Sequence, residues 1–165
     1  MTVGTGTTGS LRERMEALRE GPTSYAELEA LWADCSAVRA EQVLGMWRGS
    51  DFPAAGHPVS GMLDGARWYG KRFDSVTEAH PLICRDEAGD LVSNAELGKG
   101  IASLWDVAFR GEVTASMVYD GQPVIDHFKV VDSDEAGPTT LLGVMNGKGV
   151  TVGGQHYFFV LERDD

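Results

Sequence analysis

The feature that most constrains the fold of this chain is its pattern after Gly45, where short β-favouring runs alternate with glycine or acidic turns. Many short strands joined by turn residues predict an antiparallel sandwich or barrel. We place strands near Leu44–Phe52, Ala66–Phe73, Pro81–Asp86, Leu91–Ser93, Glu112–Tyr119, Val124–Asp132, Thr140–Met145 and Gln155–Glu162. The segment Ile101–Phe109 fits either a strand or a helical turn, so we expect about eight to ten strands in all.

The first quarter of the chain is predicted to be helical. Leu11, Met15 and Leu18 follow helical spacing, and Gly21-Pro22 ends that helix. A capping box of Ser24 and Glu27 then opens a second helix. The apolar stripe of this second helix consists of Leu28, Leu31, Trp32 and Cys35. A short turn near Ala40–Leu44 leads into the first strand.

The chain is expected to form one domain, because no linker or repeat divides it. Within that domain we predict a disordered tail at residues 1–10, helices packing on the barrel at 11–43, and the β-barrel at 44–165. The last strand, Gln155–Glu162, carries apolar side chains on both of its faces. A sheet of this kind needs a cover on each side, which the helices or the partner in a homodimer would supply.

The composition excludes several function classes. The chain has 25 acidic and 14 basic residues and a formal charge of −11, which argues against binding nucleic acid or anionic membranes. It has no apolar run of roughly 20 residues, so we expect no membrane insertion. Cys35 and Cys84 lack a CxxC spacing, and the N-terminus lacks a secretory signal. We therefore expect free thiols and a cytoplasmic location.

A glycine-flanked tryptophan, Gly45-Met46-Trp47-Arg48-Gly49, is the first informative cluster. The glycines leave room for the indole to lie flat against backbone and permit a bulged strand. In a closed barrel the first and last strands are neighbours, so we pair Trp47 with Arg163 through a cation–π contact. We interpret Gly45, Trp47, Gly49 and Arg163 as structural residues that close one end of the barrel.

The segment Arg67–Phe73 combines aromatic and basic residues. Strand alternation places Tyr69 and Lys71 on one face and Arg72 on the other. An inward Lys71 or Arg72 would meet a carboxylate or phosphate group of a ligand, whereas surface cations more often extend into solvent.

The segment Tyr119–Phe128 concentrates a phenol, a carboxylate and an imidazole. Asp126 and His127 are neighbours in a strand, so they point to opposite faces and cannot form an acid–base pair with each other. Any catalytic use of Asp126 or His127 therefore needs a partner such as Tyr119 from another strand. A buried, hydrogen-bonded His127 is the simpler interpretation.

The remaining motifs exclude common active sites. His57, His80 and His156 show no zinc-type spacing with each other or with a cysteine, so we expect no metal. The chain has no GxSxG elbow, no phosphate-binding loop and no HExxH sequence. The glycine-rich segment Gly143–Gly149 lacks a following helix and is interpreted as a turn.

Several motifs in one order resemble the bacterial GXWXG and DUF4334 family. They are GMWRG at 45–49, RWYGKRF at 67–73, FRGEVTASMVYDGQPVIDHFKVVD at 109–132, LLGVMNGKG at 141–149 and YFFVLER at 157–163. The resemblance covers Val38 to Arg163 and names no settled activity. The opening GxW with a late arginine is also similar to lipocalins and their calycin relatives, which implies a barrel that binds hydrophobic ligands. Nitrobindin-like haem proteins share the Gly-x-Trp-x-Gly pattern and use a late histidine, and His156 lies in the corresponding region.

We predict from these features that the barrel binds a small hydrophobic or amphipathic molecule, such as a lipid or fatty acid. The predicted ligand-binding residues are Tyr69, Lys71, Met117, Tyr119, Val124, His127, Phe128, Met145 and Phe159. The first alternative is an enzyme that uses Tyr119, Asp126 and His127. The second alternative is haem binding through His156 or His127.

Overall fold

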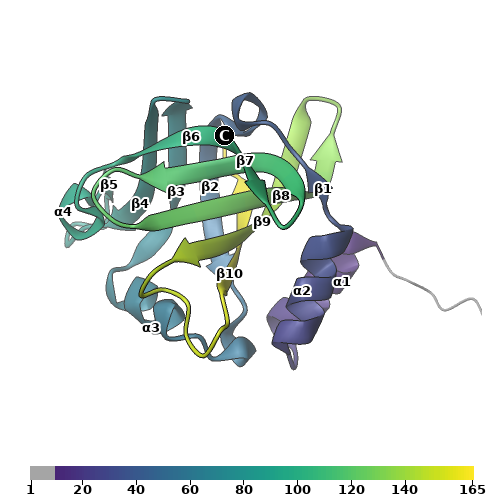
Figure 1. Ribbon diagram of the computed structural model, residues 1–165. Helices are drawn as coiled ribbons and strands as arrows, with labels where there is room; N and C mark the ends of the chain where they lie inside the picture. The colour runs from purple at the N-terminus through teal and green to yellow at the C-terminus, as the bar shows by residue number, and fades with distance from the viewer. Residues whose placement is uncertain (1–9) are drawn as a thin grey trace, which may run out of the picture.

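The computed structural model describes residues 10–165, so the predicted tail, apart from Ser10, lies outside the described residues. Figure 1 shows a barrel with two helices against its outer surface. The helices are α1 (Leu11–Glu20), α2 (Tyr25–Asp34), α3 (Pro58–Gly65) and α4 (Ala95–Gly98), with 3-10 helices at Ala40–Val43 and Pro53–Ala55. The strands are β1 (Ser36–Ala37), β2 (Gly45–Asp51), β3 (Trp68–Ser75), β4 (Glu78–Arg85), β5 (Leu91–Ser93), β6 (Ala102–Phe109), β7 (Glu112–Tyr119), β8 (Val124–Asp134), β9 (Gly137–Gly147) and β10 (Tyr157–Arg163).

The barrel closes in the order β8, β7, β6, β4, β3, β2, β10, β9, and β9 pairs with β8 to complete it. Neighbouring strands are antiparallel, β1 extends along β8, and β5 lies beside β4. The prediction of a mainly β antiparallel barrel with N-terminal helices is confirmed. Its first and last strands, β2 and β10, pair as expected.

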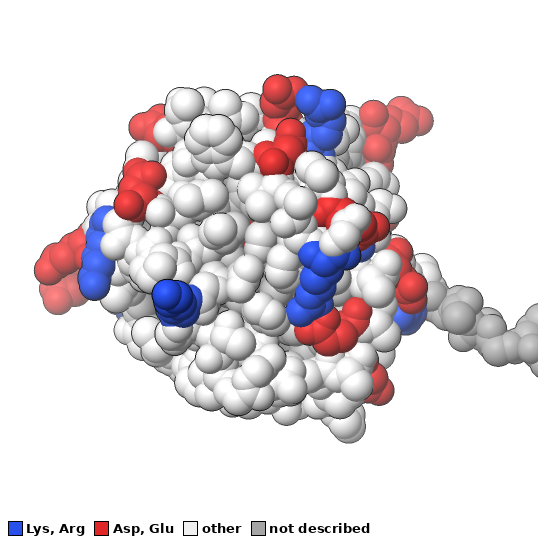
Figure 2. All heavy atoms as spheres, viewed as in Figure 1, with Lys and Arg blue, Asp and Glu red and all other residues white. Residues whose placement is uncertain are grey.

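Lys and Arg side chains are scattered singly over the face that Figure 2 shows, among more numerous acidic side chains. No basic patch forms among the described residues drawn on this face. In the part of the chain that the structure describes, no helix has both the length and the apolarity needed to cross a membrane.

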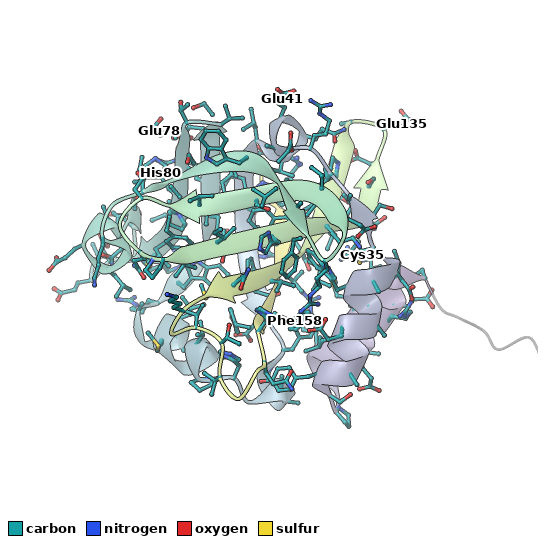
Figure 3. The ribbon with its side chains drawn as sticks, viewed as in Figure 1. Cys35, Glu41, Glu78, His80, Glu135 and Phe158 are labelled. Carbon is teal, nitrogen blue, oxygen red and sulfur yellow. The ribbon has the colours of Figure 1, made fainter. Side chains whose placement is uncertain are left out.

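The barrel wall has apolar side chains on both faces, as the pattern of the last strand predicted. Inside, Trp47, Phe73, Phe128 and Phe159 belong to one buried cluster. Outside, a second cluster joins α1 and α2 to β8, β9 and β10; it consists of Met15, Leu28, Leu31, Trp32, Cys35, Phe52, Val131, Leu142, Val144, Phe158 and Val160. Figure 3 labels two of these residues, Phe158 and Cys35, beside the helices. The helices are therefore the outer cover of this part of the wall.

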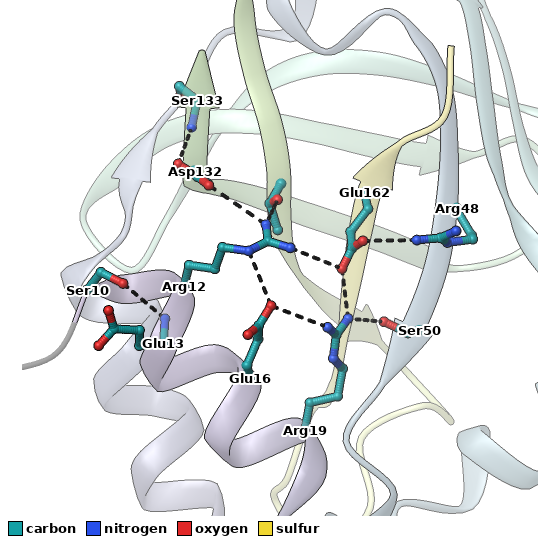
Figure 4. A network of polar contacts seen from close by, with 11 residues as sticks. Ser10, Arg12, Glu13, Glu16, Arg19, Arg48, Ser50, Asp132, Ser133 and Glu162 are labelled. Carbon is teal, nitrogen blue, oxygen red and sulfur yellow. Dashed lines mark hydrogen bonds and ion pairs between the residues drawn. The ribbon is translucent and has the colours of Figure 1, made fainter.

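Ion pairs fasten α1 to the barrel beside the outer cluster (Figure 4). Arg19 binds Glu162 of β10 at 2.8 Å and Ser50 of β2 at 3.0 Å. Arg12 of the same helix donates to Thr140 of β9 at 2.8 Å. Two partly exposed arginines of α1 thus connect the helix to three consecutive strands of the wall.

Three elements differ from the sequence-based expectation. The ambiguous segment Ile101–Phe109 is strand β6, paired along its length with β7. The helices α3 and α4 were not predicted. Gly61 and Gly65 weaken the helical pattern of α3, but His57 caps its first turn and Pro58 occupies its first position, which is a favourable start.

Candidate functional site

An apolar cavity of about 150 Å³ opens at one end of the barrel. Val59 and Leu63 of α3, Leu97 of α4 and Val150 of the β9–β10 loop lie at its outer part. The loop is held to α3, because the His57 imidazole and the Gln155 carbonyl are 3.3 Å apart. Deeper in the barrel, the cavity is lined by Leu82, Tyr119, Val124 and Met145.

Next to this cavity lies a smaller space of about 10 Å³, which is lined in part by Lys71. The two spaces share four lining residues, namely Leu63, Leu82, Tyr119 and Met145. Aromatic side chains from β3 and β10 complete the inner space: Trp68, Tyr157 and Phe159. The shared residues place the small space, with Lys71 in its wall, directly beside the apolar cavity.

Lys71 is held by three kinds of contact. Its Nζ lies 3.0 Å from Oδ2 of Asp126 and donates to the Pro81 carbonyl at 3.3 Å. The same ammonium lies over the Phe159 ring, 5.1 Å from the centroid. Tyr119 donates its hydroxyl to Asp126 Oδ2 at 3.2 Å, which makes a buried cluster of Lys71, Asp126 and Tyr119.

Burial dominates the electrostatics of this cluster. Asp126 is fully buried, and this burial raises its pKa, while Lys71 and the Tyr119 hydroxyl act in the opposite direction. Burial also raises the pKa of Tyr119 well above its usual value, and the Asp126 carboxylate adds to that effect. Asp126 Oδ1 has no hydrogen-bond partner in the described structure.

Lys71 retains hydrogen-bonding capacity beyond its two polar partners. An ammonium group has three donors, and two polar partners, Asp126 and the Pro81 carbonyl, lie within hydrogen-bonding distance. Lys71 lines the inner space, whereas Asp126 does not. Lys71 therefore has one donor beyond those that Asp126 and the Pro81 carbonyl can take up.

The opposite end of the barrel is closed by the predicted tryptophan–arginine pair. The Arg163 guanidinium lies 4.3 Å from the centroid of the Trp47 indole. Trp47 is fully buried and donates from Nε1 to the Val43 carbonyl at 2.8 Å, and Arg163 donates to the Leu44 carbonyl at 2.9 Å. Trp47 and Arg163 thus form the floor of the barrel, and Trp47 lies beside Lys71, its partner in the pairing of β2 with β3.

The glycines beside Trp47 have a different role from the one predicted. A Cβ at Gly49 would lie 2.1 Å from the indole of Trp68 on the neighbouring strand. Gly49 therefore makes room for Trp68, a lining residue of the inner cavity, and not for Trp47. Gly45 has a φ of +127°, and a Cβ there would lie 2.6 Å from Arg163 Nη1.

The predicted ligand-binding residues divide into three groups. The cavity is lined by five of them: Lys71, Tyr119, Val124, Met145 and Phe159. Met117 and Phe128 face the interior but are packed in the core without lining either space. Tyr69 and His127 lie outside the barrel interior, so their prediction as lining residues is corrected.

Tyr69 contacts Asp164, which follows β10. Its hydroxyl donates to Asp164 at 2.5 Å, and its ring lies under Arg85, 5.1 Å from the guanidinium. The register between β3 and β4 is irregular, and Trp68 and Lys71, three positions apart, both line the inner space. Simple alternation from Lys71 therefore does not place Tyr69 inside.

His127 lies on the outer face of β8, opposite to Asp126, as its adjacent position predicted. Its Nδ1 is 2.8 Å from Ser116 Oγ, its Nε2 is 3.2 Å from Asn146 Nδ2, and its ring stacks on Phe109 at 3.9 Å. Burial lowers the pKa of His127 to about 4, so it is neutral at pH 7. The catalytic combination with Tyr119 and Asp126 is therefore corrected, because the barrel wall separates His127 from them.

The two histidines suggested as haem ligands do not face the interior. His127 is on the outer face, and His156 packs edge-on against Phe109 with its Nδ1 3.2 Å from the Met145 carbonyl. Within the described residues, no group of three histidine, cysteine, aspartate or glutamate side chains with metal-binding spacing lies in the cavity. The cavity therefore offers neither of the proposed ligands to a haem iron.

Sequence reasoning missed the pairing of Lys71 with Asp126 and several apolar lining residues, among them Leu63 and Leu82. One signal for Asp126 was present, because it shares a strand face with Val124 and Phe128 and interrupts that apolar face. Its lysine partner lies on β3, four strands away from β8 around the barrel, and no local sequence pattern predicts a contact between such distant strands.

Comparisons with known proteins agree with this architecture. The model of the GXWXG protein family matches residues 30–89, and a domain of unknown function, DUF4334, matches residues 100–163. The crystal structure of a protein from Thermomonospora curvata is 35% identical in sequence, with a TM-score of 0.81. The similarity covers 94% of this chain and 98% of that chain. A search of curated proteins finds no match.

Proposed function

The chain belongs to the GXWXG and DUF4334 family, and we propose that it binds a small, uncharged molecule that has an apolar body and one hydrogen-bond acceptor. The observation that carries this proposal is the apolar cavity beside a small inner space that the buried Lys71 lines. Cavities that bind small molecules are mostly apolar with a few placed polar groups. In this proposal the apolar body lies among Leu82, Val124 and Met145, and the acceptor binds Lys71.

Stability alone does not account for the buried ion pair. Lys71 and Asp126 have side chains that are 3% and 0% exposed. Replacing such a pair with well-packed apolar residues is often neutral or stabilising, because burying two charges costs several kcal/mol per ion. Tyr119, whose pKa is raised by burial, lines the cavity beside this pair, and ionisable groups with shifted pKa values in a cavity are candidates for functional residues.

The size of the cavity restricts the ligand. Its outer part measures about 150 Å³, and an apolar cavity of about this volume holds a molecule the size of benzene. Pockets for larger ligands typically measure about 300–1,000 Å³. We therefore propose a ligand of substituted-benzene size in place of the long-chain lipid that the lipocalin resemblance suggested.

The charge of the cluster restricts the polar end of the ligand. Lys71 is already neutralised by Asp126, so an anionic ligand would bring a second negative charge near a buried carboxylate. A carbonyl or hydroxyl group accepts a hydrogen bond from Lys71 without that repulsion. A neutral ketone, ester or alcohol fits these requirements best.

The proposal is tested by titrating the full chain with acetophenone, ethylbenzene and benzoate and following ligand-observed NMR or calorimetry. We expect acetophenone to bind most tightly, because ethylbenzene has a similar shape but no acceptor and benzoate is charged. Filling the cavity by Leu82→Phe should abolish binding, whereas Met117→Leu, in the core but not in the lining, should leave it unchanged. The absence of binding by all three probes, or equal binding to Leu82→Phe, would contradict the proposal.

A further inference from the structure

A second group of polar side chains lies at the β3–β4 hairpin, on the outside of the barrel. Asp74 is the next-to-last residue of β3, Glu78 is the first residue of β4 and His80 the third, so the hairpin turn brings all three together. One possible ligand atom from each lies within 4.8 Å of the others. Figure 3 labels Glu78 and His80 at this end of the molecule.

His80 supplies an independent reason to regard this group as a site. It is only 9% exposed, and its Nε2 is buried without a hydrogen-bond partner in the described structure. That nitrogen faces the two carboxylates, at 3.4 Å from Asp74 Oδ2 and 3.8 Å from Glu78 Oε1. A buried ring nitrogen is normally hydrogen-bonded, so this one is available to a further ligand.

A contact on the other ring nitrogen fixes the orientation of His80. Its Nδ1 lies 2.8 Å from Ser93 Oγ on β5. When Nδ1 carries the proton and donates it to Ser93, Nε2 presents its lone pair to the carboxylates. A hydrogen bond on the remote ring nitrogen is how metal-binding histidines are usually oriented.

We propose that Asp74, Glu78 and His80 bind a divalent transition-metal ion, with Zn²⁺ as its representative. One imidazole nitrogen and two carboxylate oxygens form a ligand set that Zn²⁺ accepts, with a water molecule in the fourth position. The carboxylates are partly exposed, with Asp74 at 38% and Glu78 at 55%, so an ion enters directly from solvent.

Because a neighbouring arginine offsets part of the acidic charge, metal binding at this site would depend on the His80 nitrogen and not on charge alone. Arg72 Nε binds both carboxylate oxygens of Asp74, at 3.1 and 3.3 Å, and neutralises part of the negative charge. A hard ion such as Ca²⁺ needs six to eight oxygen ligands, which this hairpin does not supply. A nitrogen ligand favours Zn²⁺ over Ca²⁺.

The site was not visible as a motif because it follows the spacing Asp-x₃-Glu-x-His across a turn, without a second histidine or a cysteine. It lies outside the cavity and does not depend on the proposed ligand-binding function. Its occupation would link β3, β4 and β5, since Ser93 belongs to β5.

Calorimetric titration of the full chain with Zn²⁺ and with Ca²⁺ tests the proposal. We expect saturable binding of one Zn²⁺ and at least about tenfold weaker binding of Ca²⁺. His80→Gln and Glu78→Gln should each weaken Zn²⁺ binding at least about tenfold, and Ser93→Ala about tenfold through the loss of the orienting hydrogen bond. Glu78 is exposed at the surface, so its variant keeps the test valid if His80→Gln fails to fold.

Two matched controls accompany these variants. Glu87→Gln removes an exposed acidic residue from the neighbouring β4–β5 turn, and His156→Gln removes a histidine elsewhere; both should leave Zn²⁺ affinity unchanged. NMR of the histidine side chains should show Zn²⁺ shifting the Nε2 signal of His80. The absence of saturable Zn²⁺ binding, or equal affinities for Zn²⁺ and Ca²⁺ or for the wild type and both ligand variants, would overturn the proposal.

Discussion

Two buried lysines, one inside the barrel and one outside, have similar surroundings. Lys71 lies 3.0 Å from the Asp126 carboxylate inside the barrel, and Lys129 binds Glu112 at 2.6 Å outside it. The two lysine side chains are 3% and 1% exposed. The difference is in the carboxylates, because Asp126 is fully buried whereas Glu112 is 50% exposed.

This difference separates a structural lysine from a candidate functional one. Lys129 donates to the Trp32 carbonyl at 2.8 Å and lies over the Trp32 ring, so it joins α2 to the wall. Its carboxylate partner stays hydrated, which keeps the cost of the pair low. Lys71 instead pairs with Asp126 of the barrel itself, and Lys71 lines the small space beside the apolar cavity.

The largest expected effect is that of Lys71→Met. Asp126 would be left as an unpaired buried carboxylate, and breaking a buried ion pair in this way typically costs about 3–5 kcal/mol. Urea-induced unfolding measures this loss. The double variant Lys71→Met/Asp126→Leu should recover most of it, and a double variant as unstable as the single one would show that Lys71 stabilises the fold through packing.

The stability of the protein should depend on pH through His127, on the outer face of β8. Burial lowers the pKa of His127 from 6.5 to about 4, with smaller contributions from His156 and Arg110. The unfolded chain therefore binds more protons than the folded chain between these pH values. Stability should be complete above about pH 6.5 and fall by up to about 3 kcal/mol as the pH approaches 4.

Thermal or urea unfolding across this pH range checks the sign. His127→Gln should flatten the profile, whereas His156→Gln should retain most of the decrease. A profile unchanged by His127→Gln would mean that other groups cause the acid destabilisation.

Lys129→Met should have a smaller effect than Lys71→Met. The Trp32 carbonyl would lose its donor at a cost of about 1–3 kcal/mol, while the half-exposed Glu112 would be hydrated. Acetophenone binding should stay the same, since Lys129 lies outside the barrel. Equal losses of stability and of binding in both lysine variants would remove the distinction between them.

The smallest effect is expected in the ion-pair network of α1. Partial burial alone would raise the pKa of Glu162, but Arg19, Arg48 and Arg12 outweigh it and lower the pKa. The contribution of this carboxylate to the stability of the fold is therefore present at neutral pH and is lost as acid protonates the carboxylate. Glu162→Gln should cost up to about 1 kcal/mol, and added salt should reduce the difference measured by urea unfolding.

Local patterns predicted much of the wall. The capping box at Ser24, the alternation in β10 and the glycine-flanked Trp47 each depend on residues close in sequence, and the structure contains all three features. The helix α3 was missed because glycines obscure its period, although it lines the cavity mouth. Periodicity therefore predicted elements better than it predicted their arrangement around the cavity.

The sequence by itself determined that the chain forms a barrel with covered faces, that Asp126 and His127 lie on opposite sides of one strand, and that Trp47 pairs with Arg163. These features follow from alternation along a strand and from the pairing of the first and last strands in a closed barrel. Only the tertiary structure decided which side of β8 faces inward and brought Lys71 to Asp126. Closure of the barrel sets the register between distant strands, and that register places the buried charges beneath the cavity.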